Sequence, residues 1–587
     1  MERLPASTLN KELSAASAAC QKGDWAGAIA RLEKILAIQP RNGDALALTT
    51  YVYLSQGRFD LAEGLARKFA EWHPNDARPH SLLADALGAQ GRPTDGLASI
   101  ENALAIEIKN PDYLATKARL LMKLRSTGPA IATYREAASI KRSHPAAFEL
   151  ARILLGDSHP EEALAVLEAA STELPVNRQP HLLIAQALTQ ALRLDEAEAR
   201  WAQAERQTKS RAEYLHTRAN AETAIGRFEL AEQLLRQAID EDIEPESSFF
   251  LLTRARRMTD DDRPLIARAE AWTQVAGLDP RKVAKLHYAL GKSHDDLADY
   301  ERAIRHYDEA NRVDFSLYPF RRTYGAEEAK GYIDRLIRLY TAELIKALSA
   351  DAQPTNLPLF VVGMVRSGTT LTETILGRHP KIKAGGEQLF WTQRAPEFLH
   401  AKGGIDIEEI QRIAREYLSV IDPGATPLRH VIDKNPTNIQ LAPILHGVYP
   451  NAKFIHLQRN PVDNLLSMWM TPFDDGVRCA SNKENLVSFY REYRRLLAHI
   501  DKIVPPERFQ TIRYEDLTSN PETTVWRMLD HAGLEFEPAC LEPEKHLRVV
   551  LTPSVYQVRQ AIHPRSQGRW KNYEPWLGAF ADLLAES

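Results

Sequence analysis

Residues 359–376 have the composition of an anion-binding loop. The apolar run 359–362 is typical of a buried strand, and apolar residues recur at helical spacing from Thr369 onward. A short segment that begins at Gly363 and ends at Gly368 lies between them. In such a strand–loop–helix segment, backbone N–H groups and the positive end of the helix dipole point to the space in front of the loop. This pattern predicts a binding site for a phosphate or sulfate group. The alternative is a chance glycine-rich turn.

The loop is close in spacing to the nucleotide P-loop, G-x-x-x-x-G-K-[ST], but its lysine is missing. Thr369 stands at the lysine's position and is followed by Thr370. In triphosphate enzymes that lysine reaches the β- and γ-phosphates. Its absence argues against an ATPase, a GTPase or a phosphoryl-transfer kinase and favours a different anion. Arg366, inside the loop, can supply positive charge instead.

Two charged residues that follow other predicted elements are candidates for catalysis. Glu387 comes after two glycines and precedes the bulky run 389–391, and a carboxylate beside an apolar wall can act as a general base. Lys434 follows the strand predicted at 430–433, where its ammonium can stabilise charge that grows on a transferred group. The alternatives are a solvated loop glutamate and a surface lysine, because both residue types are mostly exposed.

A second candidate anion site follows the strand predicted at 453–458. Arg459 stands at the end of this strand, and Ser467 lies eight residues further on, along a helix that begins near Pro461. Proline suits the first turn of a helix. A guanidinium can hold a phosphate through two parallel hydrogen bonds, and a hydroxyl adds a third donor. The pair is therefore a candidate for holding a phosphate.

These polar residues must be positioned by an α/β domain. Strands are expected at 359–362, 430–433, 453–458 and 509–513. Helices are expected at 369–378, 406–421, 437–448, 461–470, 484–502 and 522–532. Strands that alternate with helices are typical of a parallel sheet with helices on its faces. In such sheets ligands bind beyond the carboxyl ends of the strands, which is where the polar residues lie.

The stretch 366–371 resembles the 5′-phosphosulfate loop of sulfotransferases that use PAPS (3′-phosphoadenosine-5′-phosphosulfate), in particular the tyrosylprotein sulfotransferase-like branch. The resemblance extends over roughly 357–575 and implies a P-loop-like fold and PAPS as co-substrate. The reaction expected from it requires no metal, and no metal cluster is visible in the sequence. Val365 departs from the family, which usually has proline there, but the change leaves every donor in place. The residues implied to hold the phosphosulfate are Arg366, Ser367, Gly368, Thr369, Thr370 and Leu371.

The resemblance also implies three catalytic residues. Glu387 follows a His-Pro pair by the family's interval and matches the base that takes the proton of the acceptor hydroxyl. Lys434 matches the lysine that stabilises the transition state, and Ser554 lies where the family carries a serine near the transferring group.

Further residues are implied to bind the rest of the nucleotide. Arg459 and Ser467 match the family's 3′-phosphate motif, and Tyr514 matches a tyrosine near the nucleotide. Arg565 lies in a segment that resembles the C-terminal loop which closes over the 3′-phosphate. Arg569 is the alternative in that loop.

Before about residue 315 the sequence repeats itself every 34 residues. Gly23, Gly57 and Gly91 open similar segments at that interval, with the aromatic residues Trp25 and Phe59 two places after the first two. This period, with its small residue, aromatic, alanine and terminal proline, is the tetratricopeptide (TPR) signature. About nine helix pairs would stack into a superhelix whose concave face typically binds a peptide or protein. The alternative is a scaffold that only oligomerises or spaces the second domain.

The predicted fold class is an all-α TPR solenoid followed by an α/β sulfotransferase domain with a parallel sheet. The expected boundaries are 1–315 for the TPR superhelix, 316–356 for a helical connector and 357–587 for the sulfotransferase domain.

The composition limits the other possibilities. The net charge of −4 shows no basic excess of the kind that suggests a nucleic-acid partner. Cys20, Cys479 and Cys540 form no C-x-x-C pair, so neither a zinc cluster nor a disulfide framework is expected. No secretory signal and no apolar run of membrane-spanning length are found. The expectation is a soluble protein of a reducing cytoplasm.

The predicted function is transfer of the PAPS sulfuryl group to an acceptor hydroxyl, with a protein tyrosine bound by the TPR array as the implied acceptor. A carbohydrate or a small molecule is the alternative acceptor, because a fold alone does not choose. The rival from another class is a TPR interaction scaffold whose second domain only binds a nucleotide. The presence of Glu387 and Lys434 beside the phosphate motifs favours the enzyme.

Overall fold

The computed structural model of the protein describes residues 5–124, 126–399, 405–421, 424, 428–473, 476–545 and 548–586. The chain divides into two compact units. The first comprises residues 1–155 and 161–183, and the second comprises residues 156–160 and 184–587.

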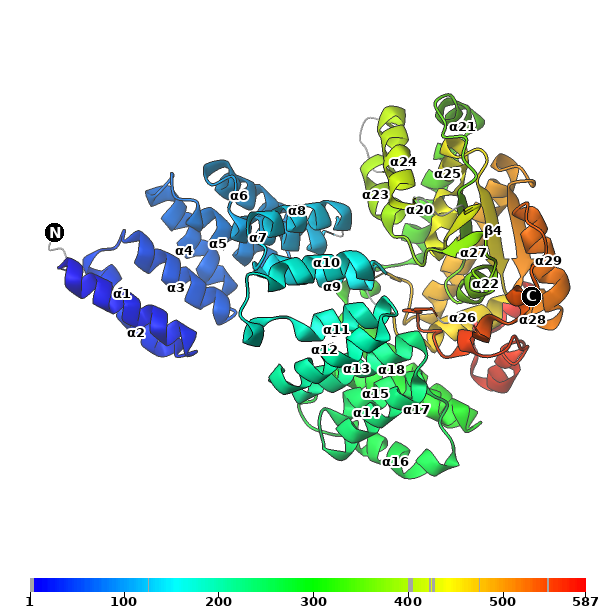
Figure 1. Ribbon diagram of the computed structural model, residues 1–587, viewed down its shortest axis with the longest axis horizontal. Helices are drawn as coiled ribbons and strands as arrows, with labels where there is room; N and C mark the ends of the chain where they lie inside the picture. Colours follow the sequence, from blue (N-terminus) through cyan, green and yellow to red (C-terminus); the bar gives the residue numbers. More distant parts are fainter. Residues whose placement is uncertain are drawn as a thin grey trace. The chain divides into compact units, whose positions relative to one another are not determined.

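The first unit is a stack of helices in which consecutive helices from α1 to α8 pack on one another (Figure 1). The helices are α1 (Ala6–Gln21), α2 (Trp25–Ile38), α3 (Gly43–Ser55), α4 (Phe59–Trp72), α5 (Arg78–Ala89), α6 (Pro93–Ile106), α7 (Pro111–Lys123), α8 (Thr127–Ile140), α9 (Pro145–Gly156) and α10 (Pro160–Ser171). Small alanines such as Ala28, Ala62 and Ala130 are fully buried between them, which lets the helices approach closely.

Glycine recurs in this array because the tight turn between two helices needs a left-handed residue. Gly23, Gly57 and Gly91 have φ values of +75°, +71° and +78°. Residues with a side chain rarely adopt this conformation, whereas glycine does so without steric cost. The 34-residue period predicted from the sequence therefore marks a backbone requirement, and the predicted helical repeat is confirmed.

The second unit begins with further helices of the same kind. They are α11 (His181–Gln190), α12 (Leu194–Gln207), α13 (Arg211–Ile225), α14 (Phe228–Asp240), α15 (Pro245–Ala255), α16 (Arg263–Trp272), α17 (Pro280–Asp296) and α18 (Tyr300–Leu317). Gly226 has a φ of +87° at one of the turns, but Leu192 and Ala298 hold the corresponding left-handed position with φ values of +60°.

The connector helices pack on the α/β part of this unit. They are α19 (Pro319–Thr323), α20 (Ala326–Leu339) and α21 (Ala342–Ser349). The Tyr340 hydroxyl, at the end of α20, donates to the Gln440 carbonyl at 2.6 Å. Leu348 of α21 is fully buried against Gly447. These contacts join the connector to the α/β domain.

A five-stranded sheet, all of whose strand pairs are parallel, forms the centre of the α/β part, in the order β2-β3-β1-β4-β5. The strands are β1 (Pro358–Gly363), β2 (Ile382–Ala384), β3 (His430–Asp433), β4 (Lys453–Gln458) and β5 (Phe509–Arg513). The predicted parallel sheet is confirmed, and four of its strands lie where the sequence placed them. The edge strand β2 was missed, because three residues are too short to show a periodicity.

Helices cover both faces of this sheet (Figure 1). They are α22 (Thr369–Leu376), α23 (Phe390–Leu399), α24 (Ile407–Ile421), α25 (Ala442–Val448), α26 (Pro461–Trp469), α27 (Lys483–Ile503), α28 (Tyr514–Ser519) and α29 (Pro521–His531). Leu359 and Val361 of β1 pack in one apolar cluster with residues of α22, α28 and α29. Phe360 points to the other face, where it stacks with Tyr417 and Tyr449. Both faces are therefore buried, as parallel sheets require.

The parallel direction brings the carboxyl ends of β1, β3, β4 and β5 to one edge of the sheet. The residues that directly follow these strands are Met364, Lys434, Arg459 and Tyr514. The polar residues found in the sequence are therefore gathered at this edge by the topology.

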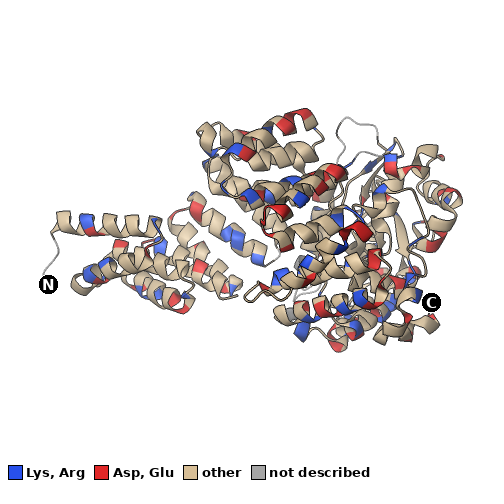
Figure 2. Ribbon diagram, turned by 90° about the horizontal axis from the view of Figure 1, so that it is seen from below, with Lys and Arg blue, Asp and Glu red and all other residues tan. Residues whose placement is uncertain are grey.

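Lysine and arginine residues are interspersed with aspartate and glutamate residues along the helices of both units (Figure 2). Within the described ranges, no helix combines the length and the apolarity that a membrane crossing needs.

The left-handed turn at Ala298 gives a prediction about stability. Because alanine is strained there and glycine is not, Ala298→Gly should raise the free energy of unfolding by about 0.5–1 kcal/mol, after the larger unfolded-state entropy of glycine is subtracted. Differential scanning calorimetry would show a higher melting temperature. The matched control is Ala202→Gly, also an exposed alanine but inside α12, which should lower stability by about 1 kcal/mol. A loss of stability in both variants would contradict the explanation of the turn.

Candidate active site

The loop between β1 and α22 has a strained, closely packed backbone. Arg366 has a φ of +69°, and Gly368 has a φ of +109°. A Cβ atom on Gly368 would lie 2.6 Å from the Tyr514 ring, and one on Gly363 would lie 2.6 Å from the Leu457 carbonyl oxygen. Both glycines are therefore required by close approach, and the strain at Arg366 is of the kind found at ligand sites.

Side chains from the next strand and helix hold this loop in place. Asn464, in the first turn of α26, donates from Nδ2 to the Val365 carbonyl at 2.8 Å. Arg459, at the end of β4, donates from Nη1 to the Arg366 carbonyl at 3.1 Å. The carbonyl groups of Val365 and Arg366 therefore point toward these two side chains. The N–H groups of the loop face the opposite side.

Two guanidinium groups lie beside the loop. Arg366 donates from Nε to the Ser467 hydroxyl at 3.2 Å and from Nη1 to the Ser554 hydroxyl at 2.5 Å. Arg459 lies over the Tyr514 ring, 4.7 Å from its centroid, and donates from Nη2 to the Ser566 carbonyl at 2.6 Å. Their partners are all neutral.

The electrostatics of this pair favour an anion. Burial, followed by the positive charges of Arg459 and Arg569, lowers the pKa of Arg366 to about 10. Burial also lowers the pKa of Arg459. Arg459 Nε and the fully buried Ser367 hydroxyl have no hydrogen-bond partner among the described residues. A bound anion would neutralise the guanidinium groups and give Arg459 Nε a partner.

A cavity of about 120 Å³ lies in front of the loop. The predicted site residues that line it are Arg366, Gly368, Thr369, Thr370, Leu371, Glu387, Arg459, Ser467, Tyr514 and Ser554. Ser367 is buried behind the loop, and Lys434 lines a neighbouring cavity. Arg569 lines the cavity, whereas Arg565 is exposed and lines neither cavity.

Glu387 and Lys434 form an ion pair at the same edge of the sheet. The Lys434 side chain is 1% exposed, whereas that of Glu387 is 47% exposed. The apolar wall expected beside Glu387 is not what surrounds its carboxylate. Trp391 turns into the core instead, where it packs on Tyr417 at a centroid distance of 5.7 Å. The environment of Glu387 is set by the lysine.

A second, larger cavity of about 820 Å³ meets the first one at Glu387. Thr370, Thr552 and Pro553 also line both cavities. Lys434 lines the second cavity from the sheet, and Gln190 lines it from the end of helix α11. A side chain in the helical array therefore borders a cavity that contains the Glu387–Lys434 pair.

Sequence analysis missed the buried Glu373. Its carboxylate accepts a hydrogen bond from the Gly386 N–H at 2.8 Å and pairs with Arg548 at 3.1 Å. Burial raises its pKa, but the charges of Arg548 and Lys434 and the Gly386 N–H outweigh this and leave the pKa below its usual value. Glu373 thus fixes the turn that presents Glu387. The only signal in the sequence was a charged residue inside an otherwise neutral helix.

Asp463 is a second buried carboxylate whose role the sequence did not reveal. It accepts hydrogen bonds from the backbone N–H groups of Gly568 and Trp570, at 2.6 and 2.9 Å. Its side chain is buried in the first turn of α26. Asp463 thereby holds the C-terminal loop beside the cavity.

Asp295, at the end of helix α17, holds the same C-terminal segment from the helical array. Its carboxylate accepts hydrogen bonds from the guanidinium of Arg569 and the hydroxyl of Tyr573. A further contact joins Phe228 of α14 to Tyr556 at a centroid distance of 5.2 Å. The segment that closes the first cavity therefore rests on the helical repeats.

The fold and the site together define a candidate anion site at the carboxyl edge of a parallel α/β sheet that follows helical repeats. Residues 358–538 match the family described as "Sulfotransferase family". Residues 19–86 and 284–316 match tetratricopeptide repeats. The chain therefore carries a sulfotransferase-family domain together with TPR repeats, and both predicted resemblances are confirmed.

Several known proteins are similar to part of this chain. An uncharacterized protein of Aquifex aeolicus is 29% identical over 52% of this chain and 41% of its own length. Protein-tyrosine sulfotransferase 1 of Danio rerio is 25% identical over 32% of this chain and 57% of its own length. Omega-hydroxy-beta-dihydromenaquinone-9 sulfotransferase Stf3 of Mycobacterium bovis is 35% identical over 18% of this chain and 30% of its own length. The chain spans less than two thirds of each relative.

The hydrogen bonds of Asp463 give a prediction for the C-terminal loop. In Asp463→Asn one acceptor oxygen is replaced by a donor, so a backbone N–H loses its partner at a cost of about 2 kcal/mol. Hydrogen exchange measured by mass spectrometry should show about 30-fold faster exchange at Gly568 and Trp570. The control is Asp530→Asn, an exposed aspartate on α29. Unchanged exchange in Asp463→Asn would show that other contacts hold the loop.

Proposed function

We propose that the protein transfers the sulfuryl group of PAPS to an acceptor hydroxyl. The observation that carries this proposal is the pair of guanidinium groups of Arg366 and Arg459, which form no ion pair with any described residue. They lie beside a glycine-rich loop at the start of α22. This combination attracts an anion, and the sulfotransferase-family match supports PAPS as that anion.

Arg366 and Arg459 can each bind one of the two anionic groups of PAPS. We assign the 5′-phosphosulfate to the loop 364–371, where N–H groups and Arg366 meet, and the 3′-phosphate to Arg459 and Ser467. Of the two candidate arginines in the C-terminal loop, we assign Arg569 to the 3′-phosphate, because it lines the cavity and Arg565 does not.

The segment 552–566 closes one side of the first cavity. This cavity of about 120 Å³ is smaller than the roughly 300–1,000 Å³ that ligand pockets usually have, but it meets the second cavity at Glu387. The bonds of Arg366 to the Ser554 hydroxyl and of Arg459 to the Ser566 carbonyl hold the segment in place. A bound donor would take over these guanidinium donors and leave the Ser554 hydroxyl beside the loop.

The reaction is an in-line displacement at sulfur. The acceptor oxygen forms a bond to sulfur while the bond from sulfur to the 5′-phosphate oxygen breaks, and PAP (3′-phosphoadenosine 5′-phosphate) leaves. Glu387 takes the proton of the acceptor hydroxyl. Lys434, Arg366 and the loop N–H groups stabilise the charge that grows on the sulfuryl and leaving oxygens, and Ser554 adds a donor.

We propose that the second cavity receives the acceptor and that the acceptor is a tyrosine of a peptide. The cavity of about 820 Å³ contains Glu387 and Lys434, and Gln190 of the helical array borders it. Its size suits a peptide segment better than a small alcohol. A tyrosine acceptor agrees with the name of one relative, and TPR arrays commonly bind extended peptides.

The donor proposal predicts selective binding of PAP. In isothermal titration calorimetry, PAP should bind more tightly than ATP or AMP. Arg459→Ala should weaken PAP binding by about 30-fold, because charged hydrogen bonds worth about 2 kcal/mol are lost. Arg513→Ala, which removes an exposed arginine at the end of β5, is the control and should bind as the parent does. Equal affinity for PAP and AMP in the folded protein would overturn the sulfotransferase proposal.

The catalytic proposal predicts that Glu387→Gln separates binding from turnover. With PAPS and a peptide that contains a single tyrosine, kcat should fall by about 10²–10⁴-fold, because the general base is lost. PAP affinity should stay within about twofold, since Glu387 does not hold the nucleotide. Glu408→Gln, an exposed glutamate of α24, serves as the control.

The same assay tests the acceptor. A peptide in which phenylalanine replaces the tyrosine should accept no sulfuryl group. Full turnover by Glu387→Gln would refute the assignment of the base. Transfer to small alcohols but to no peptide would refute the peptide acceptor and leave the sulfotransferase activity standing.

A further inference from the structure

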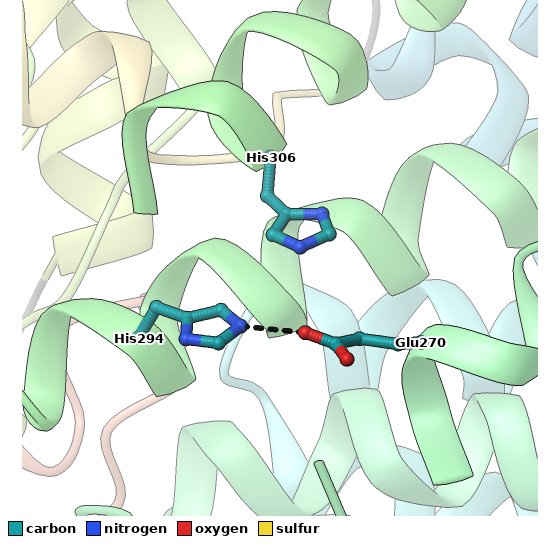
Figure 3. Close-up of side chains that lie close together, drawn as sticks. All are labelled: Glu270, His294 and His306. Carbon is teal, nitrogen blue, oxygen red and sulfur yellow. Dashed lines mark hydrogen bonds and ion pairs between the residues drawn. The ribbon is translucent and has the colours of Figure 1, made fainter. Parts of the chain in front are cut away.

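Three side chains of the last TPR helices converge on one point, and none of them lines either of the two active-site cavities. Glu270 comes from α16, His294 from α17 and His306 from α18 (Figure 3). One ligand atom of each residue lies within 4.8 Å of those of the other two. Figure 3 shows the His306 ring above the His294–Glu270 pair, with a ring nitrogen directed toward the pair.

The cluster is ordered by its own contacts. His294 is 2% exposed, and its Nε2 lies 3.0 Å from a Glu270 oxygen. The His306 ring stacks on the His294 ring with an interplanar angle of 2° and a centroid distance of 5.4 Å. His287 Nδ1 lies 3.0 Å from His306 Nδ1, so it can fix the orientation of that ring from behind. Such outer-shell bonds are typical of histidines that bind metal ions.

The charges around the cluster suit a cation. The nearby positive charge of Arg302 is paired with Asp299 at 2.6 Å. The Glu270 carboxylate brings a negative charge, and its side chain is 39% exposed, which gives an ion an entry path.

We propose that Glu270, His294 and His306 bind a divalent transition-metal ion, with zinc as the best match. Two imidazole nitrogens and one carboxylate oxygen are ligands that Zn²⁺ commonly takes, and they exclude the all-oxygen shells of Ca²⁺ and Mg²⁺. Three protein ligands leave one tetrahedral position for water. The ion would tie α16, α17 and α18 together, independently of the proposed transferase activity.

Metal titration of the full-length protein tests the site. After treatment with a chelator and its removal, Zn²⁺ titrated in a calorimeter should bind with one high-affinity site per chain. His306→Gln and Glu270→Gln should each weaken this binding by at least about 100-fold, because even outer-shell changes cost roughly 10–100-fold. Circular dichroism would verify that both variants fold. If His306→Gln does not fold, Glu270→Gln still tests the site, because glutamine has nearly the same shape as glutamate and the side chain is partly exposed.

A matched histidine controls for nonspecific binding. His216 is also half-buried in the helical array, but its Nε2 lies 2.8 Å from the Ser248 hydroxyl rather than from a carboxylate. His216→Gln should bind Zn²⁺ as the parent protein does. Co²⁺ titrated in place of Zn²⁺ should give a visible absorption spectrum that His306→Gln lacks. The proposal is overturned if no high-affinity Zn²⁺ site is found, or if Glu270→Gln and His306→Gln bind as tightly as the parent.

Discussion

Two partly buried arginines, Arg366 and Arg459, which form no ion pair with any residue that the structure describes, are the constraint on which the α/β domain depends. Arg366 and Arg459 lie close enough that the charge of Arg459 lowers the pKa of Arg366. An arrangement of this kind costs free energy in the empty protein, because burial and repulsion both disfavour charge. It persists because neutral groups solvate the guanidinium groups: the hydroxyls of Ser467 and Ser554, the carbonyl of Ser566 and the ring of Tyr514. The site is thereby organised for an anion before one arrives.

Three carboxylates near the cavity bind other groups, so the charges of Arg366 and Arg459 stay available to a ligand. Asp463 accepts from the backbone of the C-terminal loop, and Glu373 accepts from the Gly386 N–H and pairs with Arg548. Asp295 takes the guanidinium of Arg569. Each is satisfied by donors of its own, and none of them forms an ion pair with Arg366 or Arg459. The surrounding acidic residues thus fix the backbone around the cavity and leave its charge positive.

The features that could be predicted from the sequence are those that depend on short stretches of the chain. The strand–loop–helix at 359–376, four strands of the sheet and the 34-residue repeat follow from periodicity and from glycine positions, which act over a few residues. The sequence could not predict Asp463 or Asp295, because their partners lie more than a hundred residues away in the chain. The cluster of Glu270, His294 and His306 was missed for a related reason. Its three residues are 24 and 12 positions apart on three helices, so no compact motif marks it. The expectation of no metal rested on cysteine spacing and on a mechanism that requires none.

The contact of Asp295 with Arg569 and Tyr573 limits how the repeats and the α/β domain can be exchanged during evolution. A TPR array is often regarded as an exchangeable adaptor that evolution can attach to any catalytic domain. Here a residue of the last repeat neutralises an arginine that lines the cavity, and a transplanted catalytic domain would lose this partner. A change at either position therefore selects for a compensating change at the other. Natural recombination between the repeats and the α/β domain should therefore keep α14 and α17 together with the C-terminal segment, because Phe228 and Asp295 both contact it.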